Sequence, residues 1–467
     1  MLSGWGRTHP ASMWLERPRD CVQVQDALEA GAAGGLIARG AGRSYGDAAQ
    51  NAGGTVLDMT ALRSEPLLDV NTGELEVSAG STFAEILLRL ARAGHTLPVV
   101  PGTRHLTVGG AIAADIHGKN HPVSGSFGTN LRSFTLCTPA AGPIDVSRES
   151  DPELFSATLG GMGLTGVITR ARLRVVPMAN AESVADIDRV GSLDGALALM
   201  SEATDHTHAI AWLDLLSPGG AFGRALVTRS SEAPLAAGSS AERVPRRLGG
   251  RRLVPAPGRP GKPARGTAPF TERPAPAVPR NFPAGFLRPA TVRAFNTLHW
   301  HSSPRRERGR VLSMSAQLFP LDVLRDWNRL YGPGGLIQYQ FAVPDSAAEL
   351  VRAVPELLRR RRQPMYLAVL KRFGAHSEGL LSFPQQGWTV AIDLPGDAPE
   401  LARSLAEADE LVASGGGRLY LAKDARMSAE TMAATYPNLP RFREICERVD
   451  PEGLLGSDMA RRLELRS

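Results

Sequence analysis

The chain has 467 residues, of which 43% are hydrophobic and 21% are charged, a composition typical of a folded globular protein. No run of 18 apolar residues occurs and the N-terminus lacks the order of a signal peptide, so neither a membrane-spanning helix nor secretory export is expected. The three cysteines are not spaced as metal ligands, which predicts no zinc site and no disulfide framework.

The N-terminal third consists mainly of short predicted strands. One helix is well marked, because Thr82 and Glu85 have the spacing of a capping box and apolar residues repeat at helical spacing over Phe83–Ala91, before Gly94 ends it. Strands are expected over Gly35–Gly40, Gly54–Met59, Glu74–Ala79, Ser133–Thr138, Pro143–Val146 and Val167–Val176, and a second helix over Leu154–Leu159.

The stretch from Pro101 to Gly128, PGTRHLTVGGAIAADIHGKNHPVSGSFG, is apolar and also rich in glycine. Glycine lets the backbone approach a ligand closely and adopt positive φ. This combination favours a wall against a large flat ligand, and a tight-turned loop between a strand and a helix is the alternative.

Two glycine patterns resemble dinucleotide-binding motifs without their context. Gly161–Gly166 fits G-x-G-x-x-G, but an expected strand follows it instead of a helix that could meet a pyrophosphate. Gly40–Gly46 has the wrong spacing. A Rossmann domain is therefore not expected, and loops with successive N–H groups are the expected phosphate cradle.

Strands and helices alternate after Val176. This predicts a second domain of α+β type, in which helices back an antiparallel sheet. The strands include Met365–Phe373 and Trp388–Leu394, and the helices include Ala347–Arg359, Pro399–Ser414, Ala429–Thr435 and Pro440–Arg448.

The net charge of +6 comes from the segment Arg243–Arg310, which holds 16 Lys and Arg against the two acids Glu272 and Glu307. Clustered prolines disfavour helix and interior strand, so we expect a mobile insertion over about residues 232–290. Its basicity favours an anionic membrane surface or a phosphorylated lipid, and a solvated insertion is the alternative. Nucleic acid is not expected, because aromatic residues do not alternate with the basic ones.

Seven blocks together resemble one family of flavoproteins. They are RGAGRSYGD (Arg39–Asp47), PGTRHLTVGGAIAADIHGKNH (Pro101–His121), GSFG (Gly125–Gly128), GGMGLTG (Gly160–Gly166), QYQF (Gln338–Phe341), GRLYLAKD (Gly417–Asp424) and SDMARRLEL (Ser457–Leu465). Outside the basic segment, the chain is similar to the decaprenylphosphoryl-β-D-ribose 2-oxidases of actinobacterial cell-wall synthesis, in the vanillyl-alcohol oxidase superfamily.

The resemblance implies a two-domain FAD-binding fold. Residues 1–179 and 417–467 would form the FAD domain, and residues 180–416 an antiparallel-sheet substrate domain. The residues expected to line FAD are Ala38, Arg39, Gly40, Ala41, Gly42, Arg43, Ser44, Tyr45, Gly46, Asp47, Ala48, Gly102, Thr107, Val108, Gly109, Gly110, Ala114, Asp115, Ile116, His117, Ile168 and Tyr420. Many members attach FAD through a histidine, and because Arg43 stands at that position, non-covalent FAD is expected.

The implied chemistry is oxidation of a secondary alcohol, which needs a group that removes the hydroxyl proton. Lys423 is the first catalytic candidate, since apolar neighbours lower the pKa of a lysine, although it could instead stay charged and orient the substrate. Lys371 and His117 are the other catalytic candidates. The substrate-binding candidates are Lys119, Gln340, Tyr339, Trp212, Thr389 and Ala391. Thr389 and Ala391 stand where relatives carry asparagine and cysteine, so no thiol is expected in the pocket.

The resemblance thus implies FAD-dependent oxidation of the 2-hydroxyl of decaprenylphosphoryl-β-D-ribose to the 2-keto sugar, the first half of epimerisation to the arabinose donor of cell-wall arabinan. An NADH-dependent reductase would complete the epimerisation, and oxygen or a quinone would accept the electrons. A peripheral place at the plasma membrane is expected, on either face. The alternatives are an FAD-dependent alditol or aldonolactone oxidase of a soluble sugar, and a non-catalytic flavin-binding scaffold.

Overall fold

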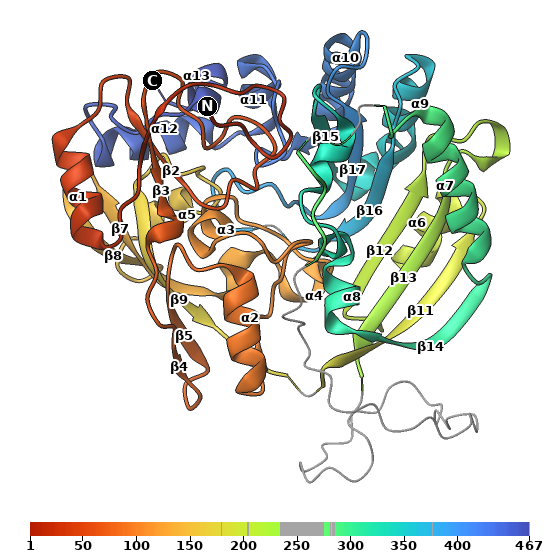
Figure 1. Ribbon diagram of the computed structural model, residues 1–467, viewed down its shortest axis with the longest axis horizontal. Helices are drawn as coiled ribbons and strands as arrows, with labels where there is room; N and C mark the ends of the chain where they lie inside the picture. Colours follow the sequence, from red (N-terminus) through yellow and green to blue (C-terminus); the bar gives the residue numbers. More distant parts are fainter. Residues whose placement is uncertain are drawn as a thin grey trace.

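The computed structural model describes residues 1–466 apart from 179, 203–204, 234–274, 281, 283–284 and 376. Two units lie side by side (Figure 1). One combines the N-terminal third of the chain with its C-terminal end, and the other is built on an eight-stranded antiparallel sheet. Most of the expected mobile insertion falls on residues 234–274 and lies outside the described residues.

The first unit contains a three-stranded parallel sheet, ordered β1-β3-β2, and a five-stranded antiparallel sheet, ordered β4-β5-β9-β7-β8. Its strands are β1 (Trp14–Glu16), β2 (Leu36–Arg39), β3 (Thr55–Asp58), β4 (Leu67–Asp69), β5 (Glu74–Ser78), β7 (Leu131–Thr138), β8 (Gly142–Ser147) and β9 (Val167–Arg174), with the pair β6 (His95–Thr96) and β10 (Val176–Pro177). Its first helices are α1 (Cys21–Ala30), α2 (Phe83–Arg92), α3 (Val108–Ala113), α4 (His121–Ser124) and α5 (Pro152–Thr158).

Local sequence signals account for several of these elements. The predicted capping box is confirmed, because the Thr82 side chain accepts from the Glu85 amide and the Glu85 carboxylate accepts from the Thr82 amide. The predicted strand after Gly161–Gly166 is also confirmed, since the chain enters β9 at Val167. The glycine motif therefore does not open a helix.

The second unit is an eight-stranded sheet, ordered β14-β11-β13-β12-β16-β17-β15-β18. Its strands are β11 (Glu182–Val190), β12 (His208–Asp214), β13 (Arg224–Glu232), β14 (Arg306–Ser313), β15 (Leu336–Val343), β16 (Leu367–Phe373), β17 (Gly387–Pro395) and β18 (Arg418–Leu419). Its helices are α6 (Leu193–Ser201), α7 (Pro289–Ser302), α8 (Met314–Leu318), α9 (Leu350–Arg360) and α10 (Leu401–Ser414). Figure 1 shows α6 behind the strands and α7 in front of them.

Alternation along the central strands separates the core from the site. On β17, Val390, Ile392 and Leu394 are fully buried, and the residues between them project from the opposite face. That opposite face carries Thr389 and Asp393. The apolar face holds the sheet against α9 and α10, so the other face is left for binding.

The two ends of the chain meet in the first unit (Figure 1). The C-terminal helices are α11 (Ala429–Thr435), α12 (Leu439–Val449) and α13 (Asp458–Arg462). Arg462 Nη2 lies 2.6 Å from Asp47 Oδ1, and Arg462 Nη1 lies 2.9 Å from Asp424 Oδ2. A Cβ on Gly46 would lie 1.9 Å from the Asp424 carbonyl oxygen, so only glycine permits this approach.

The mobile insertion was expected over about residues 232–290, and its described end, from residue 275 onward, is instead held by hydrogen bonds and leads into a helix. Helix α7 begins at Pro289, where the missing N–H of proline costs no helical hydrogen bond. Strand β14 then pairs with β11. Upstream, the Val278 amide donates to the Arg325 carbonyl at 3.0 Å, so this stretch is also held in place.

None of the described helices is long and apolar enough to span a membrane. All three cysteines are free thiols, and Cys21 Sγ lies 3.2 Å from Cys137 Sγ. This contact joins α1 to β7 and was not predicted from the sequence.

Candidate active site

A run of amide groups after β2 is free to bind an anion. The N–H groups of Ala41, Gly42, Arg43 and Ser44 donate to no described residue, and all four residues are partly exposed. Gly42 has φ +64°, which turns successive N–H groups toward one side, as in phosphate-binding nests. These groups fit the pyrophosphate of FAD.

Small residues bring a second loop against this nest. A Cβ on Gly40 would lie 2.1 Å from Thr107 Oγ1, so the two loops require glycine at this position. Thr107 is buried and accepts from the Gly110 amide at 3.4 Å, which starts α3. Open space surrounds Gly102. The predicted glycine-lined wall therefore lies beside the nest, as a flat ring system would require.

Other residues predicted to line FAD have clear partners of their own. Asp47 is paired with Arg462, Arg39 donates to the Ser3 and Ala49 carbonyls, and the Arg43 guanidinium lies 4.1 Å from the centre of the Trp5 ring. Their side chains shape the nest. The remaining predicted positions, Ala38, Tyr45, Ala48, Val108, Gly109, Ala114, Ile116 and Ile168, are buried or half-buried in the same unit.

Asp115 is a structural anchor. Its fully buried carboxylate accepts from Ser126 Oγ at 2.8 Å, Ser382 Oγ at 2.6 Å, the Gly128 amide at 2.9 Å and Ser377 Oγ. These bonds tie the glycine-rich loop to the segment after β16. Because protein donors occupy the carboxylate, its side chain has little capacity left for FAD.

Three predicted site residues and Val369 form a row across the sheet. Gln340 on β15 is paired with Ala391 on β17, Ala391 with Val369 on β16, and Val369 with Trp212 on β12. Directly paired residues project from the same face. Lys371 and Thr389 are paired in the next row. The strand register thus brings together candidates that are far apart in sequence.

His117 connects the glycine-rich loop to this face. Its Nε2 lies 3.2 Å from Gln340 Nε2, and Gln340 Nε2 lies 3.3 Å from Thr389 Oγ1. The His117 ring also packs against Phe373 and Tyr420, with centroids 4.8 and 5.2 Å away. Tyr420 donates its hydroxyl to the Ala114 carbonyl at 3.1 Å. His117 therefore marks the junction of the two units.

Three half-buried lysines surround this junction, and each has a lowered pKa. Burial, together with the charge of Lys371, lowers the pKa of Lys119 to about 7. Burial lowers the pKa of Lys371 to about 8. Burial also lowers the pKa of Lys423 to about 7, although the charge of Asp393 opposes the effect. Lys371 lies close enough for its charge to lower the pKa values of Lys119, Lys423 and His117, so the lysines form one cluster around Lys371.

Lysine is rare in this chain, and this is a signal that the sequence contained. The chain has 53 Lys and Arg, but only four are lysines: Lys119, Lys262, Lys371 and Lys423. Lys262 lies outside the described residues, and the other three meet at the site. An arginine cannot lose its proton under ordinary conditions, whereas a buried lysine can.

Asp393 is a site residue that was not predicted from the sequence. It is fully buried on β17 and accepts from Gln338 Nε2 at 2.5 Å, and the Tyr331 side chain also lies within hydrogen-bonding reach of its carboxylate. Burial raises its pKa to about 6. Gln338 and Lys423 line one small cleft beside Tyr420. The sequence did contain a signal for Asp393, because this acid alternates with Thr389 and Ala391 along an otherwise apolar strand.

Tyr339 lines the same small cleft as Gln340 and Lys423, but it does not join the row of side chains on the site face. Its neighbours along β15 alternate in direction, so its ring lies on the opposite face and packs against Phe341 at 5.8 Å. The Arg426 guanidinium lies 5.6 Å from its ring centre. The other predicted residues, Lys119, Gln340, Trp212, Thr389 and Ala391, do lie on the site side.

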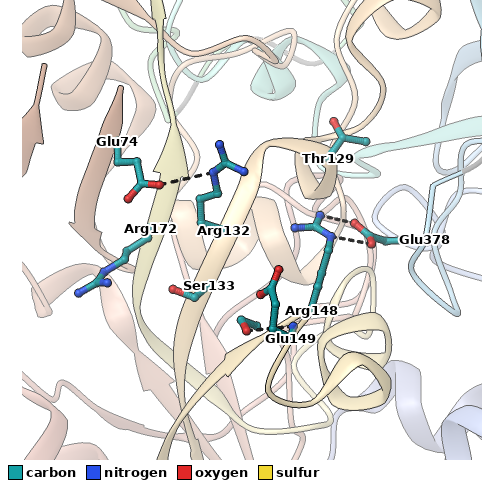
Figure 2. A pocket seen from close by; sticks show the side chains of 9 residues that line it. Glu74, Thr129, Arg132, Ser133, Arg148, Glu149, Arg172 and Glu378 are labelled. Atoms are coloured by element: carbon teal, nitrogen blue, oxygen red, sulfur yellow. Dashed lines mark hydrogen bonds and ion pairs between the residues drawn. The ribbon is translucent and has the colours of Figure 1, made fainter. Parts of the chain in front are cut away.

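A separate groove lies on the first unit (Figure 2). It is lined by charged side chains that pair with one another. Arg148 forms two hydrogen bonds to Glu378, and Arg132 Nε lies 3.6 Å from Glu74. Arg172 pairs with Glu76 at 3.1 Å. Because these charges are already compensated, we assign no ligand to the groove.

Comparisons with known proteins agree with the geometry. A protein-family profile described as FAD binding domain matches residues 15–146, and one described as D-arabinono-1,4-lactone oxidase matches residues 337–463. The first contains the amide nest and the glycine-rich loop. The second contains β15, β17 and Lys423.

Three relatives differ in how much of the chain they share. Decaprenylphosphoryl-beta-D-ribose oxidase of Mycolicibacterium smegmatis is 39% identical over 99% of this chain and 97% of its own. A Streptomyces coelicolor protein described as the uncharacterized protein in the mprA 5' region is 38% identical over 82% of this chain and 99% of its own. L-galactono-1,4-lactone dehydrogenase 1 of rice is 32% identical over 38% of this chain and 30% of its own.

The first of these matches covers both units, including the nest, the loop of His117 and the three lysines. FAD is the cofactor, and the two-unit α+β architecture is that of the vanillyl-alcohol oxidase type. The chain belongs to the decaprenylphosphoryl-β-D-ribose oxidase family of FAD-dependent oxidoreductases.

Proposed function

We propose that the protein oxidises the 2-hydroxyl of decaprenylphosphoryl-β-D-ribose to the 2-keto sugar with bound FAD. The observation that carries this proposal is the clustering of Lys119 and Lys423 around Lys371, beside His117 at the junction of the two units. A neutral sugar does not require buried cations. A phosphate linked to the sugar is an anion that buried lysines can bind, and its negative charge offsets the repulsion between their ammonium groups.

The FAD domain is proposed to comprise residues 1–179 and 417–467, and the substrate domain residues 180–416. The amides of Ala41 to Ser44 would hold the pyrophosphate, and the wall from Thr107 to His117 would face the ring system. Bound FAD supplies an acceptor for the hydride that leaves the sugar carbon.

Separate side chains remove the hydroxyl proton, bind the sugar and bind the phosphate. Lys423 takes the hydroxyl proton, which its lowered pKa permits near neutral pH. Gln340, held between His117 and Thr389, keeps its amide oxygen for a sugar hydroxyl. Lys119 and Lys371 bind the phosphate. Trp212 lies farther along the same face and supports the start of the lipid tail.

The 2-keto product and the lipid tail define the partners. Epimerisation requires a second enzyme that returns a hydride to the keto carbon, and we propose an NADH-dependent reductase. A lipid-linked substrate places the protein at the membrane surface as a peripheral protein.

The decisive experiment is anaerobic reduction of the FAD-loaded protein by candidate substrates. A short-chain polyprenylphosphoryl ribose should bleach the visible flavin absorbance. Free ribose and L-galactono-1,4-lactone at the same concentration should not. Faster bleaching by the lactone would instead support an aldonolactone oxidase, which the family match over residues 337–463 makes the second candidate.

A matched pair of variants tests the lysine assignment. Lys371→Gln should raise KM for the phosphorylated substrate at least tenfold while FAD stays bound. Arg372→Gln is the control. The Arg372 guanidinium lies 2.8 Å from the Asp345 carboxylate, and this ion pair lies outside the pocket. Bleaching by none of the substrates would favour a non-catalytic flavoprotein.

A further inference from the structure

Helix α7 is attached to the sheet by a narrow stripe and leaves a broad face exposed. Val292 and Asn296 are buried, and Asn296 Nδ2 donates to Asp214 Oδ1 at 2.9 Å. In contrast, Phe295 and Leu298 are 60% and 69% exposed. These residues are three apart, so they are neighbours on one side of the helix. Large apolar side chains at such exposure indicate a surface that contacts something else.

The apolar surface continues before the helix. Phe286 is 58% exposed, and its ring contacts the Phe282 ring with centroids 5.3 Å apart. Phe295 stacks on His299 at 5.6 Å with an interplanar angle of 13°. This stacking holds the Phe295 ring in an exposed position.

Cationic side chains follow the apolar ones. Figure 1 shows α7 at the outer side of the large sheet, where the chain runs into the edge strand β14. Arg305 and Arg310 are exposed there, and Arg310 pairs with Glu307 at 3.4 Å. Arg306 is instead paired in register with Asp188 and projects from the opposite face of the sheet. Glu307 is the one acid between Phe286 and Ser313 in the sequence. An apolar patch followed by arginines complements an anionic lipid surface.

The exposed face is also close to the site. His299 of α7 packs edge-on against Trp212, with centroids 5.0 Å apart. Trp212 belongs to the row that contains Ala391 and Gln340. A lipid tail that leaves the pocket along this row would therefore reach α7 directly.

We propose that the α7–β14 surface, formed by Phe286, Phe295, Leu298, Arg305 and Arg310, docks on an anionic lipid bilayer. The inference rests on the proposed function, because it gives the lipid-linked substrate a short path from the bilayer to the pocket. A second copy of the chain is a poorer occupant, since docking would bring two arginine-rich edges together.

Vesicle sedimentation tests the surface with the full-length, FAD-loaded chain. Vesicles of phosphatidylglycerol and phosphatidylcholine should bind the protein, and pure phosphatidylcholine vesicles should bind it at least tenfold more weakly. The double variant Phe295→Ser with Leu298→Ser should lose about tenfold in binding, because its apolar contacts are removed. Arg305→Glu with Arg310→Glu should lose at least as much at low salt.

Control variants carry the same changes elsewhere. Leu67→Ser removes a 63% exposed leucine from the first unit, and Arg403→Glu reverses an exposed arginine on α10. Both should bind vesicles like the unmodified protein. Undiminished binding by the α7 or β14 variants would overturn the proposal, as would failure of the unmodified protein to bind anionic vesicles. Loss of self-association in the α7 variant, without loss of vesicle binding, would assign the surface to a second copy instead.

A second readout separates this inference from the proposed function. The α7 variant should oxidise a detergent-dispersed short-chain polyprenylphosphoryl ribose at the unmodified rate. If vesicle binding depends on α7 but no polyprenyl substrate bleaches the flavin, the docking surface stands and the proposed substrate fails. If bleaching occurs but vesicle binding ignores α7, the docking surface fails.

Discussion

The choice of lysine over arginine is the most informative residue-scale feature of the site. Four lysines occur among 53 basic residues, and the three in the described part of the chain form one cluster around Lys371. Arginine would supply charge there without the possibility of deprotonation. Lysine at these positions therefore points to proton transfer or to a compact charge that a phosphate can neutralise.

Replacing Lys423 tests proton transfer directly. Lys423→Ala and Lys423→Arg should both lower kcat by about 10²- to 10⁴-fold, because neither side chain can accept the hydroxyl proton. The visible flavin spectrum should persist in both variants, since the amide nest lies elsewhere. Near-normal turnover of Lys423→Arg would show that only the positive charge matters at this position.

The pH dependence follows from the same group. The Lys423 amine accepts a proton only when it is deprotonated, and its pKa is about 7. Flavin reduction at saturating substrate should therefore rise about tenfold per pH unit below 7 and level off above it. The phosphate-binding lysines lose their charges as pH rises, Lys119 through about 7 and Lys371 through about 8, so KM should increase from pH 7 upward. A pH-independent rate between 5 and 7 would contradict the assignment.

Attachment of FAD gives a third prediction at this scale. Arg43 stands in the nest where many relatives of this superfamily carry a flavin-linked histidine, and its guanidinium already packs on Trp5. Arginine offers no imidazole nitrogen for the bond. Acid precipitation should leave a colourless pellet and all of the FAD in the supernatant. Flavin that remains with the polypeptide would refute non-covalent binding.

Residue patterns predicted much of the site but not the face from which each side chain projects. Gln340, Thr389 and Lys371 lie together as expected, whereas Tyr339 projects from the other side of β15. Alternation along a strand makes this unavoidable for adjacent residues. Asp393 was not predicted. An acid within the run WTVAIDL can be assigned to the pocket only once Thr389 and Ala391, with which it alternates, are known to face the pocket.

At the scale of elements, the sequence predicts well the helices whose ends are marked by capping residues. Helix α2 begins at its capping box, and the prediction over Phe83–Ala91 is confirmed within one residue. Helix α7 was not predicted, because its start at Pro289 falls at the end of the proline-rich insertion expected over about residues 232–290. Pro289 instead occupies the first turn of the helix, where its fixed φ is favourable.

The capping box of α2 supports a stability prediction. Thr82 Oγ1 lies 3.4 Å from the Glu85 amide, and the Thr82 amide lies 2.8 Å from Glu85 Oε2. Thr82→Ala should lower the free energy of unfolding by about 1 kcal/mol, because the first turn loses a hydrogen-bond acceptor. Thr82→Ser keeps the acceptor and should cost clearly less. Denaturant unfolding of the two variants measures the difference, and equal stability would contradict this role for the Thr82 hydroxyl.

At the scale of the whole molecule, the site exists because distant segments are held together. Asp47, which follows the amide nest in the same loop, lies 415 residues before Arg462, and Tyr45 donates its amide to the Ala422 carbonyl at 2.9 Å. No local pattern predicts such pairs. The resemblance to a family implied that the ends of the chain meet, but the residues that join them became visible only in the structure.

Arg462 is the side chain through which this closure can be tested. It contacts Asp47 beside the nest, Asp424 beside Lys423 and the Met427 carbonyl, and its side chain is only 24% exposed. Arg462→Ala leaves two mostly buried carboxylates without their cation, so unfolding should become easier by about 3 kcal/mol. FAD should also dissociate more readily, because the two halves of its site are no longer joined.

The neighbouring Arg461 provides the matched control. Its side chain is 51% exposed and pairs with Asp458 at 2.5 Å on the same helix. Arg461→Ala should therefore cost less than about 1 kcal/mol and leave FAD binding unchanged. Thermal unfolding with and without added FAD measures both effects, since a ligand that binds only the folded state raises the midpoint in proportion to its affinity. Equal behaviour of the two variants would mean that the ends of the chain are held together by apolar packing alone.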